Sequence, residues 1–173
     1  MKFIQALLIA LCCGALVGCI EDPNPTYEQT TRVKIGDLAP DFTVATIDNQ
    51  CITLSALRDK IVLLTFFSST CPDCQDQFEY IGSKITAFDE SKFLFLPISR
   101  GEQTAVTEKF RRENGYTFDI GLDPDRTIYE LYATQYVPRN YLIGLDGRVI
   151  ALSAEPTHAQ LDALLAQIAE LTK

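Results

Sequence analysis

The chain has 173 residues, of which 47% are hydrophobic and 22% are charged, and its formal net charge is -8. This length allows one domain with an apolar core, which needs no help from disulfides or metals. An acidic chain whose only basic cluster is Arg111-Arg112 is repelled by phosphate backbones, so we do not expect it to bind nucleic acid.

Residues 1–18 are expected to be a signal peptide, because Lys2 precedes an apolar run too short to span a membrane. The run ends in an LVGC motif at 16–19 that resembles the bacterial lipobox. This resemblance implies cleavage before Cys19, lipidation of Cys19, and a folded domain anchored on the periplasmic or extracellular side of a bacterial envelope. The alternative is an ordinary signal peptide in which Cys19 is incidental. Residues 19–32 are polar and contain Pro23 and Pro25, which predicts a flexible tether.

The first half of the remaining sequence predicts a hairpin, a strand and a helix. Residues 42–47 and 51–54 read as two strands joined by a turn at 48–50. Residues 61–67 are almost continuously apolar, which is typical of a central strand covered on both faces. After a short loop, a helix begins near Cys71, and its apolar residues are three or four apart: Phe78, Ile81, Ile85 and Phe88.

The second half predicts further strands and helices. Residues 93–98 form a strand with Pro97 near its end, 103–114 a helix, 118–120 a strand and 125–132 a helix. Residues 140–143 and 149–152 form a hairpin around Asp146-Gly147, and a capping box at 157–160 opens the last helix. This order predicts one α/β domain at 33–173, a three-layer sandwich with a central mixed sheet and helices on both faces.

Cys71-Pro72-Asp73-Cys74 lies where the most hydrophobic strand passes into an amphipathic helix. The unpaired N–H groups and dipole of a helix N-terminus stabilise an adjacent thiolate, so Cys71 is the candidate nucleophile. Cys74 lies on the same helical face and can attack a mixed disulfide. Pro72 suits the first turn, whereas the charge of Asp73 opposes thiolate formation and favours a reducing pair.

Other roles for the cysteines are less well supported. Zinc needs four ligands, and beyond the pair the domain offers only Cys51 and His158. A structural disulfide across four residues constrains the unfolded chain little. We expect Cys51 to be a small buried residue away from the site and His158 to be a surface residue.

Several motifs together resemble the thioredoxin superfamily, and in particular the TlpA/ResA-like envelope thiol-disulfide oxidoreductases. They are GDLAPDF at 36–42, LSALRDK at 54–60, the CPDC motif, YVP at 136–138 and LIGLDG at 142–147. The resemblance implies a thioredoxin-like fold with an N-terminal β-hairpin. It also implies a redox-active Cys71–Cys74 disulfide that needs no other cofactor and no metal.

The resemblance further implies that Pro138 is cis and packs beside the cysteines, with the Val137 backbone available to substrate. Arg139 is expected at the rim of the site, where it would favour acidic substrate segments. Thr70, Thr65 and Gln77 are expected around the cysteines. Thr65 and Gln77 stand where relatives often have acids. Because a hydroxyl and an amide are not bases near neutral pH, neither can accept the proton of Cys74. Asp76 or water is the alternative acceptor.

These observations favour an enzyme that reduces protein disulfides in the envelope and receives electrons from a membrane thiol donor. A peroxiredoxin is a second hypothesis, because APDF at 39–42 also occurs in that class, although Leu64 and Ser68 occupy the places of its Pro and Thr. A third is a redox-silent binding lipoprotein that keeps the fold as a scaffold.

Overall fold

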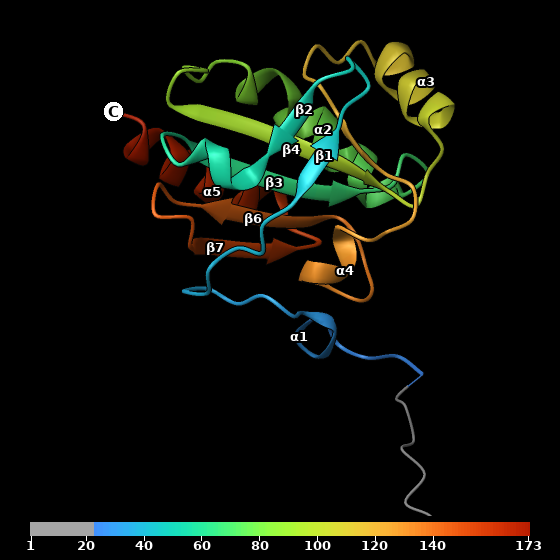
Figure 1. Cartoon of the computed structure of the whole chain (residues 1–173), viewed down its shortest axis with the longest axis horizontal. Coiled ribbons are helices and arrows are strands. Elements are labelled where there is room, and N and C mark those ends of the chain that lie inside the picture. Colours follow the sequence, from blue (N-terminus) through green and yellow to red (C-terminus); the bar gives the residue numbers. More distant parts are fainter. Residues whose placement is uncertain (1–22) are drawn as a thin grey trace, which may run out of the picture.

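A five-stranded mixed sheet with the order β5-β4-β3-β6-β7 lies at the centre of the computed structural model, which describes residues 23–173 (Figure 1). β3 runs parallel to β4 and antiparallel to β6, while β5 and β7 form the two edges. All seven residues of β3 are buried, as expected of a central strand with both faces covered. The predicted mixed sheet is confirmed. The strands are β3 (Ile61–Phe67), β4 (Phe93–Arg100), β5 (Gly121–Asp123), β6 (Arg139–Ile143) and β7 (Val149–Ala154).

Helices and a hairpin cover the two faces of the sheet (Figure 1). On one face, Phe67 of β3 meets Phe78 of α2 (Pro72–Ile85) with 4.7 Å between ring centroids, and α5 (His158–Leu171) packs beside α2. On the other face, Phe66 meets Tyr129 of α4 (Tyr129–Tyr132) at 5.4 Å. The alternation of β3 side chains therefore produces the predicted three-layer sandwich. The other elements are α1 (Tyr27–Thr30), β1 (Thr43–Ala45), β2 (Cys51–Thr53), the 3-10 turn η1 (Leu54–Leu57) and α3 (Thr104–Asn114).

The predicted N-terminal hairpin is present as β1 and β2, which pair antiparallel in front of the sheet (Figure 1). It packs closely against β5, where a Cβ atom at Gly121 would lie only 2.9 Å from a Val44 methyl group. Gly121 is thus required for the close approach between hairpin and sheet.

Three elements differ in extent from their predictions. β4 continues past Pro97 to Arg100. Proline has no N–H to donate, but β5 pairs with β4 only from Ile98 onward, so Pro97 has no neighbouring strand on the β5 side. The strand expected at 118–120 begins instead at Gly121, since Phe118 stacks on Tyr116 in the core. The helix expected from 125 begins at Tyr129, whose N–H donates to the carboxylate of Asp123.

Residues 23–32, the described part of the predicted tether, include an ordered turn. Thr26 forms a capping box with Gln29 at the start of α1, and Thr30 is buried against the domain. The predictions for the signal peptide and for Cys19 lie outside the described residues. Within residues 23–173, none of the helices has the length and apolar character required to cross a membrane.

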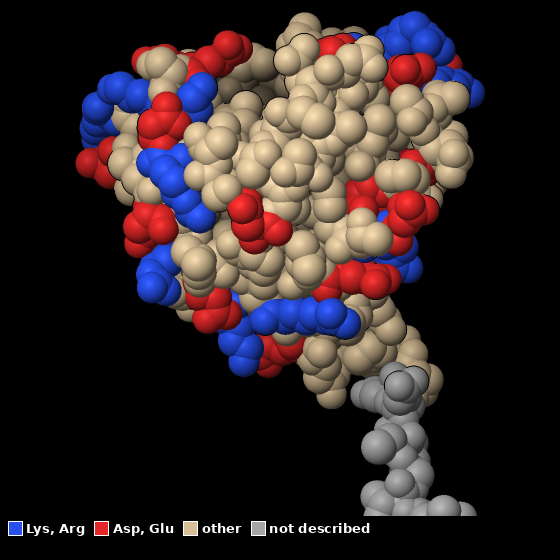
Figure 2. Space-filling model, viewed as in Figure 1, with Lys and Arg blue, Asp and Glu red and all other residues tan. Residues whose placement is uncertain are grey.

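On the face shown in Figure 2, acidic and basic side chains are interspersed around the periphery, and the centre is mostly uncharged. The β1–β2 hairpin lies over this centre in the same view (Figure 1). This face therefore carries no continuous basic surface of the kind that binds nucleic acid.

Candidate active site

The two cysteines of the CPDC motif lie at the end of β3 and the start of α2. Cys71 is the N-cap of α2, with extended backbone angles, and Pro72 is the first helical residue. The side chain of Cys71 is partly exposed, whereas Cys74 is completely buried one turn into the helix. Both thiols are free. The pair therefore consists of an accessible sulfur at a helix N-terminus and a second sulfur covered by the protein.

The reactive end of this pair faces a segment distant in sequence. The Cys71 thiol donates to the backbone oxygen of Val137, with 3.5 Å between Sγ and oxygen, and the Val137–Pro138 peptide bond is cis. Val137 and Pro138 come just before β6, which pairs directly with β3. The sheet thus brings the predicted substrate-binding residues beside the predicted nucleophile.

Burial raises the pKa of the Cys74 thiol well above its usual range, and the neighbouring Cys71 and Asp73 raise it further. The backbone N–H of Ser68 acts in the opposite direction, but its effect is smaller than that of burial. Cys74 is consequently a protonated thiol near neutral pH and must lose this proton before it can act as a nucleophile.

A closed polar network lies behind the cysteines, between β3, α2, β6 and β7. Thr65 donates to Asn140 at 2.7 Å, and the amides of Gln77 and Asn140 donate to one another at 2.9 and 3.0 Å. Asn140 also donates to Ser153 at 3.2 Å. Two amides and two hydroxyls accept no proton near neutral pH, so the network satisfies buried polar groups without providing a base.

The loop that leads into Cys71 is held by a residue that the sequence analysis did not single out. Glu102 accepts hydrogen bonds from the Ser68 hydroxyl at 2.9 Å and from the Ser69 backbone and hydroxyl at 3.0 and 2.8 Å. Its other oxygen accepts from Ser99 at 2.7 Å. Glu102 follows β4, the parallel neighbour of β3, so both strands deliver their carboxyl ends to the same edge of the sheet. The signal in the sequence that could have identified Glu102 was an acidic residue directly after β4, the strand parallel to β3.

The polar residues predicted around the cysteines differ in exposure. Thr70 and Asp73 are exposed beside Cys71, and the hydroxyl oxygens of Thr70 and Ser68 are 3.1 Å apart. Asp76, the predicted alternative proton acceptor, is exposed and 2.9 Å from the imidazole of His158. His158 is a surface residue, as expected, and it fastens the start of α5 to α2.

The prediction that Arg139 lies at the rim of the site is wrong, because its side chain is fully buried. Arg139 is the first residue of β6 and stands opposite Phe66, so its side chain leaves the sheet on the face that carries α4. There it donates to the hydroxyls of Thr30 and Thr31, at the end of α1. It therefore cannot offer its charge to an acidic substrate as expected.

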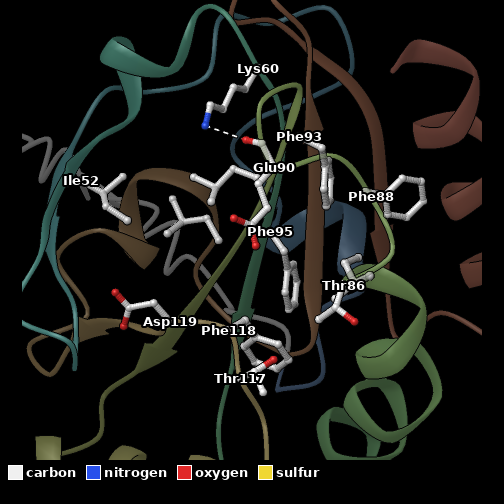
Figure 3. Close-up of a pocket in the computed structure, with 13 residues that line it drawn as sticks. Ile52, Lys60, Thr86, Phe88, Glu90, Phe93, Phe95, Thr117, Phe118 and Asp119 are labelled. Carbon is white, nitrogen blue, oxygen red and sulfur yellow. Dashed lines mark hydrogen bonds between the residues drawn. The ribbon is translucent and has the colours of Figure 1, made fainter. Parts of the chain in front are cut away.

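The prediction that Cys51 is buried is also wrong. The burial pattern of β2 shows that Cys51 is exposed, because β2 belongs to the two-stranded hairpin outside the central sheet. A cavity of about 290 Å³ lies near this hairpin, between Ile52, Phe93, Phe95 and Phe118 (Figure 3). It adjoins the first residues of β4 and the last residues of α2, at the end of the sheet opposite Cys71.

Residues 35–152 match the AhpC/TSA family. A thiol-disulfide oxidoreductase named ResA from Bacillus thuringiensis is 24% identical over 95% of this chain and 94% of its own. The ResA of Bacillus subtilis is 26% identical over 73% of this chain and 71% of its own.

Solved structures show the same fold. A structure from Bacteroides thetaiotaomicron, provisionally assigned as a protein disulfide isomerase, has a TM-score of 0.79 and 33% identity over 83% of this chain and 92% of its own. A Chlorobium tepidum structure, provisionally assigned as the thiol:disulfide interchange protein DsbE, has a TM-score of 0.74 and 24% identity, covering 82% of this chain and all of its own. The thioredoxin-like fold predicted from the motifs is therefore confirmed.

Proposed function

Because this chain belongs to the AhpC/TSA family of thioredoxin-fold proteins, we propose that it is a thiol-disulfide oxidoreductase that reduces protein disulfides through Cys71 and Cys74. One observation carries the proposal: an accessible thiol at the N-terminus of α2, against the Val137 backbone, precedes a buried thiol by one helical turn. The relatives named as thiol-disulfide oxidoreductases support the same assignment.

The reaction follows from this geometry. The Cys71 thiolate attacks one sulfur of a substrate disulfide, and the other substrate sulfur leaves as a thiolate. Cys74 then gives up its proton to water or to Asp76 and attacks Sγ of Cys71, which forms the Cys71–Cys74 disulfide and releases the second substrate sulfur as a thiolate. The substrate gains the two electrons that the dithiol gives up. The protein needs no cofactor besides this disulfide.

The order of attack is set by burial. Cys71 reaches solvent, whereas Cys74 has no exposed surface and a raised pKa, so an incoming disulfide meets Cys71 first. The cis-proline segment lies beside Cys71, and its backbone is available to align an extended substrate in the manner of an added strand.

Envelope attachment is part of the proposal. The lipobox-like motif at 16–19 supports lipidation of Cys19 and a folded domain outside the cytoplasm, where protein disulfides form. A membrane-bound dithiol donor would then restore the reduced pair after each cycle. The substitution Cys19→Ser is expected to move the protein from the membrane fraction to the soluble fraction, and equal membrane association of both forms would refute the anchor.

Reduction of insulin and of hydrogen peroxide, with dithiothreitol as the electron donor, tests the function. We expect the protein to accelerate precipitation of the insulin B chain and to leave peroxide consumption at the rate of dithiothreitol alone. Rapid peroxide consumption without insulin reduction would establish a thiol peroxidase instead. Inactivity in both assays would identify a redox-silent binding protein.

A further inference from the structure

The segment Pro25–Thr31, called here the N-terminal turn, is fastened to the loop that precedes the cis-proline. The Tyr136 hydroxyl donates to the Pro25 backbone oxygen at 2.8 Å, and the rings of Tyr27 and Tyr136 are 4.8 Å apart. The Thr134 N–H donates to the Thr30 oxygen at 2.9 Å. The turn thus packs against the residues immediately before Val137 and Pro138.

Arg139, the residue after the cis-proline, forms hydrogen bonds to the turn. Its guanidinium donates to the hydroxyls of Thr31 and Thr30 at 2.6 and 2.5 Å, and its Nε donates to the Gln135 oxygen at 2.9 Å. The ring centroid of Tyr27 is 5.1 Å from its Cζ atom. One planar group therefore ties the turn and the cis-proline loop together.

This guanidinium is fully buried, and no Asp or Glu among residues 23–173 lies within ion-pair distance of it. Burying a charge without a counter-charge is costly, so neutral hydrogen bonds and the Tyr27 ring must compensate for the lost hydration. An apolar residue would fill the same space at a lower cost. A buried arginine at this position is explained if its role is to fix the N-terminal turn against the cis-proline loop.

Tyr27 lies beside the loop that leads to the cis-proline, because its ring is 4.8 Å from the ring of Tyr136, the residue before Val137. Burial raises the pKa of Tyr27, and the carboxylates of Glu155 and Asp73 raise it further. Asp73 belongs to the CPDC motif, and the Glu155 backbone N–H donates to the Pro138 oxygen at 3.2 Å. The side chain of Tyr27 is half-buried, and it lines a hollow that also includes Ala154 at the end of β7.

An open hollow of about 900 Å³ separates the N-terminal turn from β7. Its lining includes Tyr27 of the turn, Arg139, and Ser153 and Ala154 of the edge strand β7. Ala154 pairs with Arg139, and the N–H of the next residue, Glu155, donates to the Pro138 oxygen at 3.2 Å, so this hollow adjoins the cis-proline segment. A polypeptide bound beside Val137 would extend toward it, whereas a small disulfide at Cys71 would not reach it.

We propose that the N-terminal turn forms one wall of the surface that receives the polypeptide flanking a substrate disulfide, with Tyr27 as a specificity-determining residue and Arg139 as a positioning residue. This inference rests on the proposed oxidoreductase function and adds what distinguishes its protein substrates from small disulfides: contact between the N-terminal turn and the polypeptide that flanks the disulfide. The segment that leads toward the membrane anchor is then also part of the substrate site.

The test compares reduction of insulin with reduction of glutathione disulfide in the full chain carrying Tyr27→Ala. Loss of an aromatic contact is expected to raise KM for insulin about three- to tenfold, with kcat for insulin and kcat/KM for glutathione disulfide unchanged. Arg139→Lys keeps the charge but loses the planar fork, and it should give the same pattern. Tyr80→Ala removes a half-buried tyrosine that stacks on His158 instead, so it should change neither substrate.

Equal changes for both substrates, or no change for insulin in Tyr27→Ala, would overturn the proposal. A fall in kcat with unchanged KM would also overturn it, because that result would place Tyr27 in the chemistry and not in binding. If the unmodified protein reduces neither substrate, the proposed function itself fails, and this outcome is separate from any effect of the variants.

Discussion

Replacing Cys71 with serine is expected to abolish disulfide reduction, lowering kcat/KM for insulin by about three orders of magnitude or more. A serine hydroxyl does not ionise near neutral pH and cannot form a mixed disulfide. Cys74 cannot take over, because it is buried and its raised pKa keeps it protonated. The fold should be unaffected, since Cys71 is a partly exposed N-cap and serine is a good residue at that position.

Cys74→Ser is expected to fail differently. Cys71 can still attack, but the mixed disulfide with the substrate has no second sulfur to resolve it, so a covalent complex should accumulate. Non-reducing electrophoresis followed by mass spectrometry would detect this complex and identify the proteins trapped from envelope extracts. Cys51→Ser is the matched control, because Cys51 is an exposed free cysteine in the distant hairpin, and this variant should keep full activity. Substantial activity in Cys71→Ser, or no trapping by Cys74→Ser, would contradict the assigned roles.

Phe78→Ala is expected to lower the free energy of unfolding by about 3–5 kcal/mol, which is a large part of the stability of a typical domain. Phe78 is fully buried in the active-site helix and lies at the centre of an aromatic cluster. Its ring is 4.7 Å from Phe67 of β3 and 5.9 Å from Phe110 of α3. The truncation leaves a cavity that these rigid rings cannot fill. Urea unfolding at constant m-value would measure the loss.

The control for this prediction is Val106→Ala on α3, where the side chain is 43% exposed. Substitution at such a surface position should change the unfolding free energy by roughly 0.5 kcal/mol or less. A loss below about 1 kcal/mol in Phe78→Ala would show that the cluster contributes much less than its burial implies.

The location of the cysteine pair was predictable because it depends on local signals. The apolar run of β3, the break at Ser68–Thr70 and the apolar spacing of α2 are adjacent in sequence, so strand, loop and helix N-terminus could be placed without knowledge of the rest. Gln77 and Thr65 were expected near the pair from the family resemblance, and both contribute to the buried network. The element bounds were less accurate at β5 and α4, where the Asp123 carboxylate and the aromatic cluster outweigh local propensity.

The residues that were missed or misplaced depend on contacts between distant segments. Asn140 completes the polar network only because β6 pairs with β3 in a register that places it opposite Thr65. Glu102 reaches the cysteine loop only because β3 and β4 are parallel neighbours. Arg139 was expected at the rim of the site because it follows Pro138, yet its position in β6 turns it to the buried face. Cys51 was expected inside, but its strand lies in the separate hairpin.

By itself, the sequence determined the α/β class and the position of a dithiol at a helix N-terminus, and it predicted which cysteine leads, since each follows from residues within one or two turns of one another. Only the tertiary structure decided what surrounds the sulfurs: the Val137 oxygen beside Cys71, the carboxylate that holds the preceding loop, and the N-terminal turn locked over a buried guanidinium. The reason is physical. Hydrophobic periodicity and capping act over a few residues, whereas strand register and side-chain burial are set by the packing of the whole sheet.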